Sequence, residues 1–290
     1  MIDQAARLRK KVKDNKRKDT GKNTRIIAIA SGKGGVGKSN TTVNLGLSLQ
    51  KMGESVLLID ADIGMANIDI LLGLTPSYNL SHVLKGRSSF KEAIIEGPDG
   101  INILPGTSGV EDLIDISFEE VIRLLEASNQ MEEDYDFVLI DIGAGIHKSV
   151  VNFIRAADEA IIVLTPEPTA IMDAYSLIKI LANHDFNNNL GLLLNQVNSN
   201  NEGEKIIKRM TRAIKEYIKL NVDFVSFIPY DSYVKRSVKQ QEAVISLFPH
   251  SKAGEAFRET ASKLIDNRDT RPSRGMRGFI YRIIGIFNRD

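Results

Sequence analysis

The architecture of this 290-residue chain follows from one segment, Gly32-Lys33-Gly34-Gly35-Val36-Gly37-Lys38-Ser39. The segment matches the pattern G-x-x-x-x-G-K-[ST], in which glycines let the backbone curl so that successive N–H groups point at nucleotide phosphates. An apolar run at residues 25–31 precedes it, and an amphipathic helix pattern begins near Lys38. Since a chance glycine-rich turn rarely has a strand before it and a helix after it, we interpret the segment as a phosphate loop.

The residue types of this loop indicate its chemistry. Lys38 is expected to bridge the outer phosphates, and the Ser39 hydroxyl to ligate Mg²⁺. The positive end of the following helix faces the same anion. The predicted nucleotide-binding set is Gly32, Lys33, Gly34, Gly35, Val36, Gly37, Lys38, Ser39 and Asn40.

A second lysine in the loop narrows the prediction. An ordinary phosphate loop does not need Lys33, and Lys-Gly-Gly-Val-Gly-Lys-Ser resembles the deviant Walker A motif of the MinD/ParA ATPases. The resemblance implies that Lys33 reaches the phosphates of a second subunit in an ATP-bound homodimer, where other NTPases use an arginine finger. Asn40 stands where the family usually has threonine, and its amide can still donate to a phosphate.

Two further apolar runs, residues 55–60 and 137–141, end in aspartates. Carboxylates at the carboxyl ends of buried strands lie at the ligand edge of a parallel sheet. The resemblance implies that Asp62 orients the attacking water, that Asp60 supports the Mg²⁺ shell, and that Asp141 holds Mg²⁺ through a water. It also implies that Asn67 lies near the dimer face. The alternative for Asp60 and Asp62 is that they cap the next turn.

A glycine-containing stretch follows Asp141. Gly143 and Gly145 are expected to form a second switch, in which a backbone N–H senses the γ-phosphate. MinD itself usually has proline at the position of Gly143. The glycine resembles the flagellar branch of the family, FlhG.

The ends of the last two predicted strands resemble the adenine-binding edges of the family. An asparagine amide can pair with the donor and acceptor on the edge of adenine, so Asn195 is the candidate for base recognition. Pro229, Tyr230 and Asp231 are expected to line the same pocket. Capping of a loop is the alternative for Asn195 and Asp231.

Strand and helix patterns alternate along the remainder of the chain. Strands are expected at residues 101–105, 160–165, 191–195 and 222–228, and helices at 80–86, 90–96, 118–126, 169–182, 202–220 and 252–265. This alternation implies right-handed crossovers. The predicted fold class is therefore α/β, a doubly wound, mostly parallel sheet with helices on both faces, as in MinD-like P-loop NTPases.

Composition excludes several function classes. The chain has no cysteine, which excludes disulfides, thiolate metal sites and the iron–sulfur relatives of this family. The four histidines (His82, His147, His184 and His250) show no ligand spacing and are expected to be structural or exposed. No apolar run approaches the ~20 residues of a membrane-spanning helix. The first 25 residues and the last 24 are basic, so the body between them is net acidic, which disfavours nucleic-acid binding.

The C-terminal segment sorts at helical spacing into an apolar and a polar side. The apolar arc contains Met276, Phe279, Ile280, Ile283, Ile284, Ile286 and Phe287. Bulky apolar residues flanked by arginines are typical of an interfacial helix, and the family carries a membrane-targeting helix at this end. ATP-driven dimerisation would double the anchors on an anionic membrane surface. Packing into the core is the alternative.

The N-terminal Asp3-Gln4-Ala5-Ala6-Arg7-Leu8-Arg9 resembles the D-Q-A-x-x-L-R element of the FlhG branch. In that branch the element activates the signal-recognition-type GTPase FlhF, which makes Asp3, Gln4, Ala5, Leu8 and Arg9 candidates for partner activation. The resemblance implies that Gln4 helps to order the attacking water of that GTPase. A disordered basic tail is the alternative.

These observations predict three parts: a basic extension (1–24), an ATPase domain (25–266), and a tether with an amphipathic helix (267–290). The expected activity is slow, Mg²⁺-dependent, dimer-activated hydrolysis of ATP to ADP. The resemblance implies a cytoplasmic switch that associates reversibly with the inner face of the membrane and controls flagellar number through FlhF and flagellar C-ring proteins. A cell-division MinD and a DNA-partitioning ParA-type scaffold are the alternatives.

Overall fold

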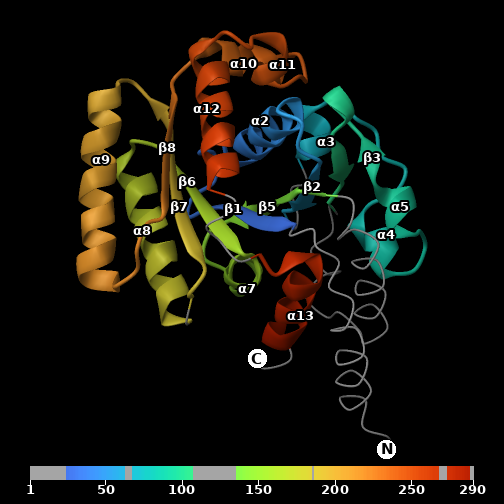
Figure 1. Cartoon of the computed structure of the whole chain (residues 1–290), viewed down its shortest axis with the longest axis horizontal. Coiled ribbons are helices and arrows are strands. Elements are labelled where there is room, and N and C mark those ends of the chain that lie inside the picture. The colour runs from blue at the N-terminus through green and yellow to red at the C-terminus, as the bar shows by residue number, and fades with distance from the viewer. Residues whose placement is uncertain (1–23, 63–66, 107–134, 185, 268–272, 288–290) are drawn as a thin grey trace, which may run out of the picture.

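The computed structural model describes residues 24–62, 67–106, 135–184, 186–267 and 273–287. Within these residues, eight strands form one sheet in the order β3-β4-β2-β5-β1-β6-β7-β8 (Figure 1). The strands are β1 (Arg25–Ser31), β2 (Val56–Ala61), β3 (Ile95–Glu96), β4 (Asn102–Leu104), β5 (Phe137–Ala144), β6 (Glu159–Leu164), β7 (Asn189–Val197) and β8 (Phe224–Pro229). Every neighbouring pair is parallel except β3 and β4. The predicted α/β fold with a mostly parallel sheet is confirmed.

The central strand β1 shows why the sheet needs cover on both sides. Its residues are fully buried and alternate between two apolar clusters: Ile26, Ala28 and Ala30 belong to one, and Ile27 and Ile29 to the other. Because successive side chains of a strand point to opposite faces, a strand this apolar requires helices above and below.

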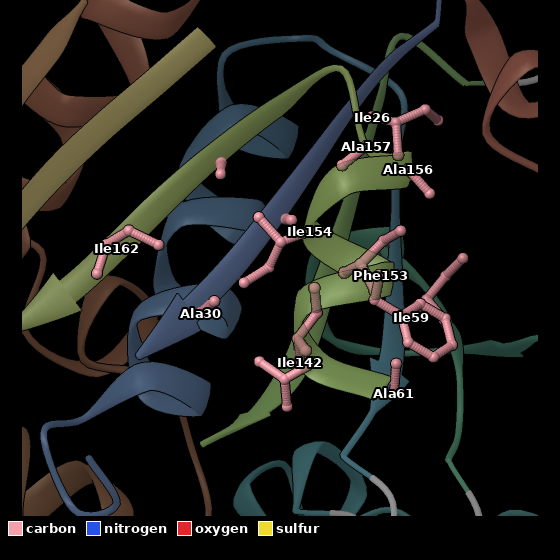
Figure 2. Packing of buried hydrophobic residues seen from close by; sticks show 14 of the residues in the cluster. Ile26, Ala30, Ile59, Ala61, Ile142, Phe153, Ile154, Ala156, Ala157 and Ile162 are labelled. Atoms are coloured by element: carbon pink, nitrogen blue, oxygen red, sulfur yellow. The ribbon is translucent and has the colours of Figure 1, made fainter. Parts of the chain in front are cut away.

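Helices provide that cover. Their bounds are α2 (Lys38–Lys51), α3 (Ile68–Leu71), α4 (Leu80–Leu84), α5 (Phe90–Ala93), α7 (Lys148–Ala156), α8 (Pro168–Asn183), α9 (Asn200–Ala213), α10 (Ser232–Lys239), α11 (Val244–Leu247), α12 (Lys252–Asp266) and α13 (Gly275–Phe287). Helices α2, α11 and α12 pack in the cluster on one face, and α4, α7, α8, α9 and α13 in the cluster on the other (Figure 1). Figure 2 shows Phe153 and Ile154 of α7 over the strands.

Some elements differ from the sequence prediction. The expected helix over 90–96 ends at Ala93, and Ile95–Glu96 pairs antiparallel with β4. In the region of the expected helix over 202–220, α9 ends at Ala213, and a π-helical turn, Ile214–Ile218, follows it. The short helices α3, α7, α10 and α11 were not predicted from the sequence. The expected helix over 118–126 and the N-terminal extension lie outside the described residues.

The C-terminal helix forms as predicted, but its apolar side is covered. Met276, Phe279, Ile280 and Ile283 are each at most 7% exposed and belong to the same core cluster as α7. Phe279 lies 6.5 Å from Phe153, centroid to centroid, and Arg282 pairs with Asp158 at 2.8 Å. The helix was expected beyond the last element of the fold, and it instead packs beside α7 below the sheet, because α7 presents an apolar face there (Figure 1).

In the part of the chain that the structure describes, no helix has the length and apolar character needed to cross a bilayer. Ile286 is partly buried against the same cluster as Met276, Phe279, Ile280 and Ile283, and the side chains of Ile284 and Phe287 lie outside the described ones.

Candidate nucleotide and magnesium site

A cavity of about 840 Å³ opens at the carboxyl edge of β1, β2 and β5. Its wall is formed by the phosphate loop, the ends of β2 and β5, the cap and the last two residues of α3, the first turns of α7 and one residue of α10. This volume is within the range of small-molecule sites. The predicted residues that line it are Gly34, Gly35, Gly37, Lys38, Ser39, Asn40, Asp62, Asn67 and Gly143. His147, for which the sequence indicated no role, also lines it.

Two glycines of the loop are required by close approaches. Gly37 has φ +87°, and a Cβ there would lie 2.4 Å from Nδ2 of Asn195. A Cβ on Gly32 would lie 2.3 Å from the carbonyl oxygen of Asp173 in α8. A side chain at position 32 would therefore push the loop away from α8, whereas one at position 37 would be strained by the positive φ and would displace the Asn195 amide.

Lys38 lies inside an acidic pocket. Its Nζ is 2.8 Å from Oδ1 of Asp141 and 3.6 Å from Oδ2 of Asp62, and the side chain is 7% exposed. The Thr42 hydroxyl donates to the same Oδ1 at 3.0 Å. The sequence analysis missed Thr42, although it lies one helical turn after Lys38 and therefore on the same face of α2.

The donor set fits Mg²⁺. The second oxygen of Asp141, Oδ2, is buried and has no hydrogen-bond partner, so it can accept from a metal-bound water. Ser39 Oγ lies 3.5 Å from Nζ of Lys38, on the same side of the cavity. Among the described residues no group of three or more His, Cys, Asp or Glu is arranged for a metal.

Asp60 organises the chain after β2. Its carboxylate accepts backbone N–H groups from Asp62 (3.1 Å), Asn67 (2.8 Å) and Ile68 (3.1 Å). Burial and then the nearby Asp141 carboxylate raise the pKa of Asp60 to about 6, against the effect of these N–H donors. Asp60 therefore caps the turn that follows β2, as the alternative stated. Support of the Mg²⁺ shell by Asp60 stays a prediction.

Asp62 faces the second switch. Burial raises the pKa of its carboxyl, and Lys38 opposes the shift. A Cβ on Gly143 would lie 3.1 Å from Oδ1 of Asp62, so glycine gives this carboxylate room beside β5. Gly145 has φ +110°, and its N–H donates to the carbonyl of Ser31 at 2.9 Å. Asp62, the second switch and the end of β1 just before the phosphate loop therefore meet at one place.

Lys33 points elsewhere. It does not line the cavity; its Nζ donates to Oε2 of Glu167 at 3.0 Å and to Oγ1 of Thr169 at 2.9 Å. The side chains of Lys33 and Glu167 are 39% and 65% exposed. Sequence reasoning missed both of its partners, because they lie more than 130 residues along the chain and belong to no motif.

The predicted adenine-side residues have local partners. Asn195 donates from Nδ2 to the Val36 carbonyl at 2.8 Å and accepts the Gln196 N–H at 2.9 Å. Asp231 caps α10 by accepting from Tyr233 N (3.0 Å) and also accepts from Ala253 N (3.1 Å).

Pro229 ends β8, and Tyr230 after it is exposed. Base recognition by this group stays a prediction.

Asn40 uses its side-chain oxygen locally. Its Oδ1 accepts from Nδ2 of Asn44 at 3.0 Å, one turn along α2.

The predicted partner-activation residues, Asp3 to Arg9, lie outside the described residues.

Comparison with known proteins agrees with this geometry. A family described as an AAA domain matches residues 24–193, which span the phosphate loop, Asp62 and Asp141. The antiactivator FleN of Pseudomonas aeruginosa is 40% identical over 82% of this chain and 85% of its own length. The chain belongs to the MinD/ParA family of P-loop ATPases.

Other members of the family extend the likeness. The flagellum site-determining protein YlxH of Helicobacter pylori is 36% identical over 90% of each chain. The fold is similar to MinD of Pyrococcus horikoshii complexed with Mg-ADP, with TM-score 0.68, 28% identity, and coverage of 86% of this chain and 99% of that one. As a member of this ATPase family, the chain uses ATP, ADP and Mg²⁺.

Proposed function

We propose that the chain is a switch that dimerises with ATP and uses Lys33 on the nucleotide of the partner copy. One observation carries the proposal: of the two lysines in the phosphate loop, Lys38 lies in its own cavity whereas Lys33 points out of it. A cation on the outer face of the loop can reach the phosphates of a second copy placed face to face.

The chemistry within each copy falls to the residues that line the cavity. Lys38 would leave Asp141 to hold the outer phosphates, and Ser39 with Asp141 would then hold Mg²⁺, which supplies charge neutralisation. Asp62 would accept a hydrogen bond from the attacking water and orient it. Lys33 of the other copy would complete the charge balance, which makes hydrolysis depend on the dimer.

Sedimentation equilibrium with Mg²⁺ tests this proposal. Wild type is expected to be monomeric with ADP and dimeric with a non-hydrolysable ATP analogue, and Lys33→Ala to remain monomeric with both. Binding of ADP by Lys33→Ala should stay within about twofold of wild type, because Lys33 does not contact its own site. A Lys33→Ala protein that dimerises and hydrolyses ATP normally would contradict the proposal.

We further propose that α13 carries the switch to a membrane. Support comes from its composition, in which bulky apolar residues stand beside Arg277 and Arg282, with Arg274 immediately before the helix. The helix must leave α7 before its apolar side can enter a bilayer, so the two positions exclude each other. The Arg282–Asp158 ion pair opposes that departure.

Liposome sedimentation distinguishes the two positions. Full-length protein should sediment with anionic vesicles when bound to the ATP analogue and stay in solution with ADP. A chain truncated at Arg274 should stay in solution with both. Binding of the truncated chain equal to that of the full chain would exclude α13 as the anchor.

Support for a flagellar role comes from the relatives FleN and the flagellum site-determining protein YlxH, and from the Asp3–Arg9 element. We propose that the chain limits flagellar number and site, acting on the FlhF GTPase and on flagellar C-ring proteins. Deletion of residues 1–20 should remove stimulation of GTP turnover by FlhF without changing ATP binding. Unchanged GTP turnover would favour the cell-division alternative, and ATP-dependent binding to DNA but not to vesicles would favour the ParA-type one.

A further inference from the structure

We propose that Glu167 holds Lys33 on its own chain and thereby weakens dimerisation. A bound nucleotide must then draw Lys33 away from Glu167 before the dimer forms. The inference rests on the proposed action of Lys33 across a dimer and adds the competitor that this lysine must leave. No motif of the sequence points to Glu167.

Glu167 and Thr169 form a receptor for one ammonium group. The Lys33 ammonium lies 3.0 Å from the carboxylate and 2.9 Å from the hydroxyl. Glu167 occupies the N-cap position of α8, yet its side chain makes no capping hydrogen bond to the helix. An N-cap side chain ordinarily satisfies the first free N–H groups of its helix. The carboxylate is instead directed at Lys33.

The receptor is fixed relative to the phosphate loop. Gly32 packs so closely on α8 that a Cβ would meet the Asp173 backbone, so the start of the loop and the start of α8 are held together. Pro168 fixes the backbone at the first position of α8. The contact between Lys33 and Glu167 is therefore a defined alternative position for the lysine.

The surrounding surface is open to a second copy. Met172, about one turn along α8 from Thr169, is 60% exposed, and Ile146 beside the second switch is 50% exposed. The ion pair itself is solvent-exposed, and such pairs change an equilibrium by at most about fivefold. A modest restraint of this size can be overcome by a stronger anion.

The phosphates of a bound nucleotide are that stronger anion. ATP offers a γ-phosphoryl group with more charge and more acceptor oxygens than one carboxylate, whereas ADP lacks this group. Lys33 would leave Glu167 for ATP of the partner and would stay with Glu167 when the partner holds ADP. In a two-fold dimer both copies contain the restraint, so its effect on dimer affinity counts twice.

The test is the dimer dissociation constant of Glu167→Gln, measured by sedimentation equilibrium with Mg²⁺ and either ADP or a non-hydrolysable ATP analogue. Glutamine keeps the shape and removes the charge. We expect the variant to dimerise about three- to twentyfold more tightly with the analogue, and to form dimer with ADP at concentrations where wild type is monomeric. High salt should reduce the difference, because it screens the exposed pair.

Two further variants isolate the effect. Asp99→Asn removes a comparably exposed pair, Asp99 with Lys51 at 2.7 Å, at the far end of α2, and should leave the dimer constant unchanged. In a Lys33→Ala background, the added Glu167→Gln change should not restore dimer formation with either nucleotide, since the restraint acts only through Lys33.

The outcomes separate the restraint from the function on which it rests. If wild type dimerises with the analogue and Glu167→Gln dimerises equally or more weakly, the restraint is wrong and the dimer stands. If wild type remains monomeric with the analogue, the dimer and the restraint are both wrong.

Discussion

Lys38 and Lys33 lie five residues apart in one loop and have opposite surroundings. Lys38 is 7% exposed and contacts Asp141, which is fully buried. Lys33 is 39% exposed and contacts Glu167, which is 65% exposed. A buried pair is costly to break because a desolvated charge is left behind, whereas an exposed pair exchanges with little cost. The loop thus contains one lysine fixed to its own site and one that is able to leave.

The substitution with the largest expected effect removes Lys38, the lysine that is fixed to its own site. Lys38→Ala should lower affinity for Mg-ADP more than about 100-fold, because it removes the charge that faces the phosphates. It should also destabilise the nucleotide-free protein by about 3 kcal/mol, since Asp141 would keep its charge without a cation. Calorimetric titration and urea unfolding measure the two effects. Lys33→Ala is the matched control, and equal losses in both variants would contradict the distinction between the lysines.

Asp141→Asn should remove the dependence on magnesium. Wild type is expected to bind ADP about tenfold more tightly with Mg²⁺ than with EDTA, and the variant about equally in the two conditions. The reason is the buried Oδ2, which has no protein partner and would be replaced by an amide nitrogen or a neutral oxygen. Retention of the full magnesium effect in the variant would exclude Asp141 from the metal site.

The acidic pocket around Lys38 also predicts a pH dependence. Asp60 has its pKa raised from 3.8 to about 6, so the native state binds its proton more tightly than the unfolded state does. This contribution to stability is present below pH 3.8 and is lost as the pH rises through 6, to a total of about 2 to 3 kcal/mol. Urea unfolding of the nucleotide-free protein at pH 4 to 7, compared with Asp60→Asn, measures it. Parallel profiles for the two proteins would contradict the raised pKa.

The smallest expected effect is that of removing the Thr42 hydroxyl from the pocket. Thr42→Val keeps the size of the buried side chain and removes the 3.0 Å hydrogen bond to Asp141. The loss should cost about 1 kcal/mol of stability and weaken ADP binding severalfold, because Asp141 is then held by Lys38 alone. An unchanged affinity would mean that Thr42 only packs.

How far the sequence predicted this molecule depends on how local each feature is. The phosphate loop, the sheet and the aspartates at strand ends follow from short patterns, because the carboxyl ends of parallel strands necessarily meet at one edge. Glu167 and Thr169 could not be found this way, since their contact with Lys33 depends on the packing of α8 against Gly32. For α13, periodicity predicted which residues share a face, but not that α7 covers that face.

The central claim is that each hydrolytic site is completed by Lys33 of the other copy. Mixing two inactive variants, Lys33→Ala and Asp62→Ala, tests it most directly. In a mixed dimer, the site with Asp62 intact receives Lys33 from the Asp62→Ala copy, so one complete site forms. We predict that an equal mixture regains ATPase activity, up to about half of the wild-type rate if every dimer is mixed, since one of the two sites in a mixed dimer is complete. A mixture as inactive as the separate variants would contradict the account, because it would mean that Lys33 acts within its own chain.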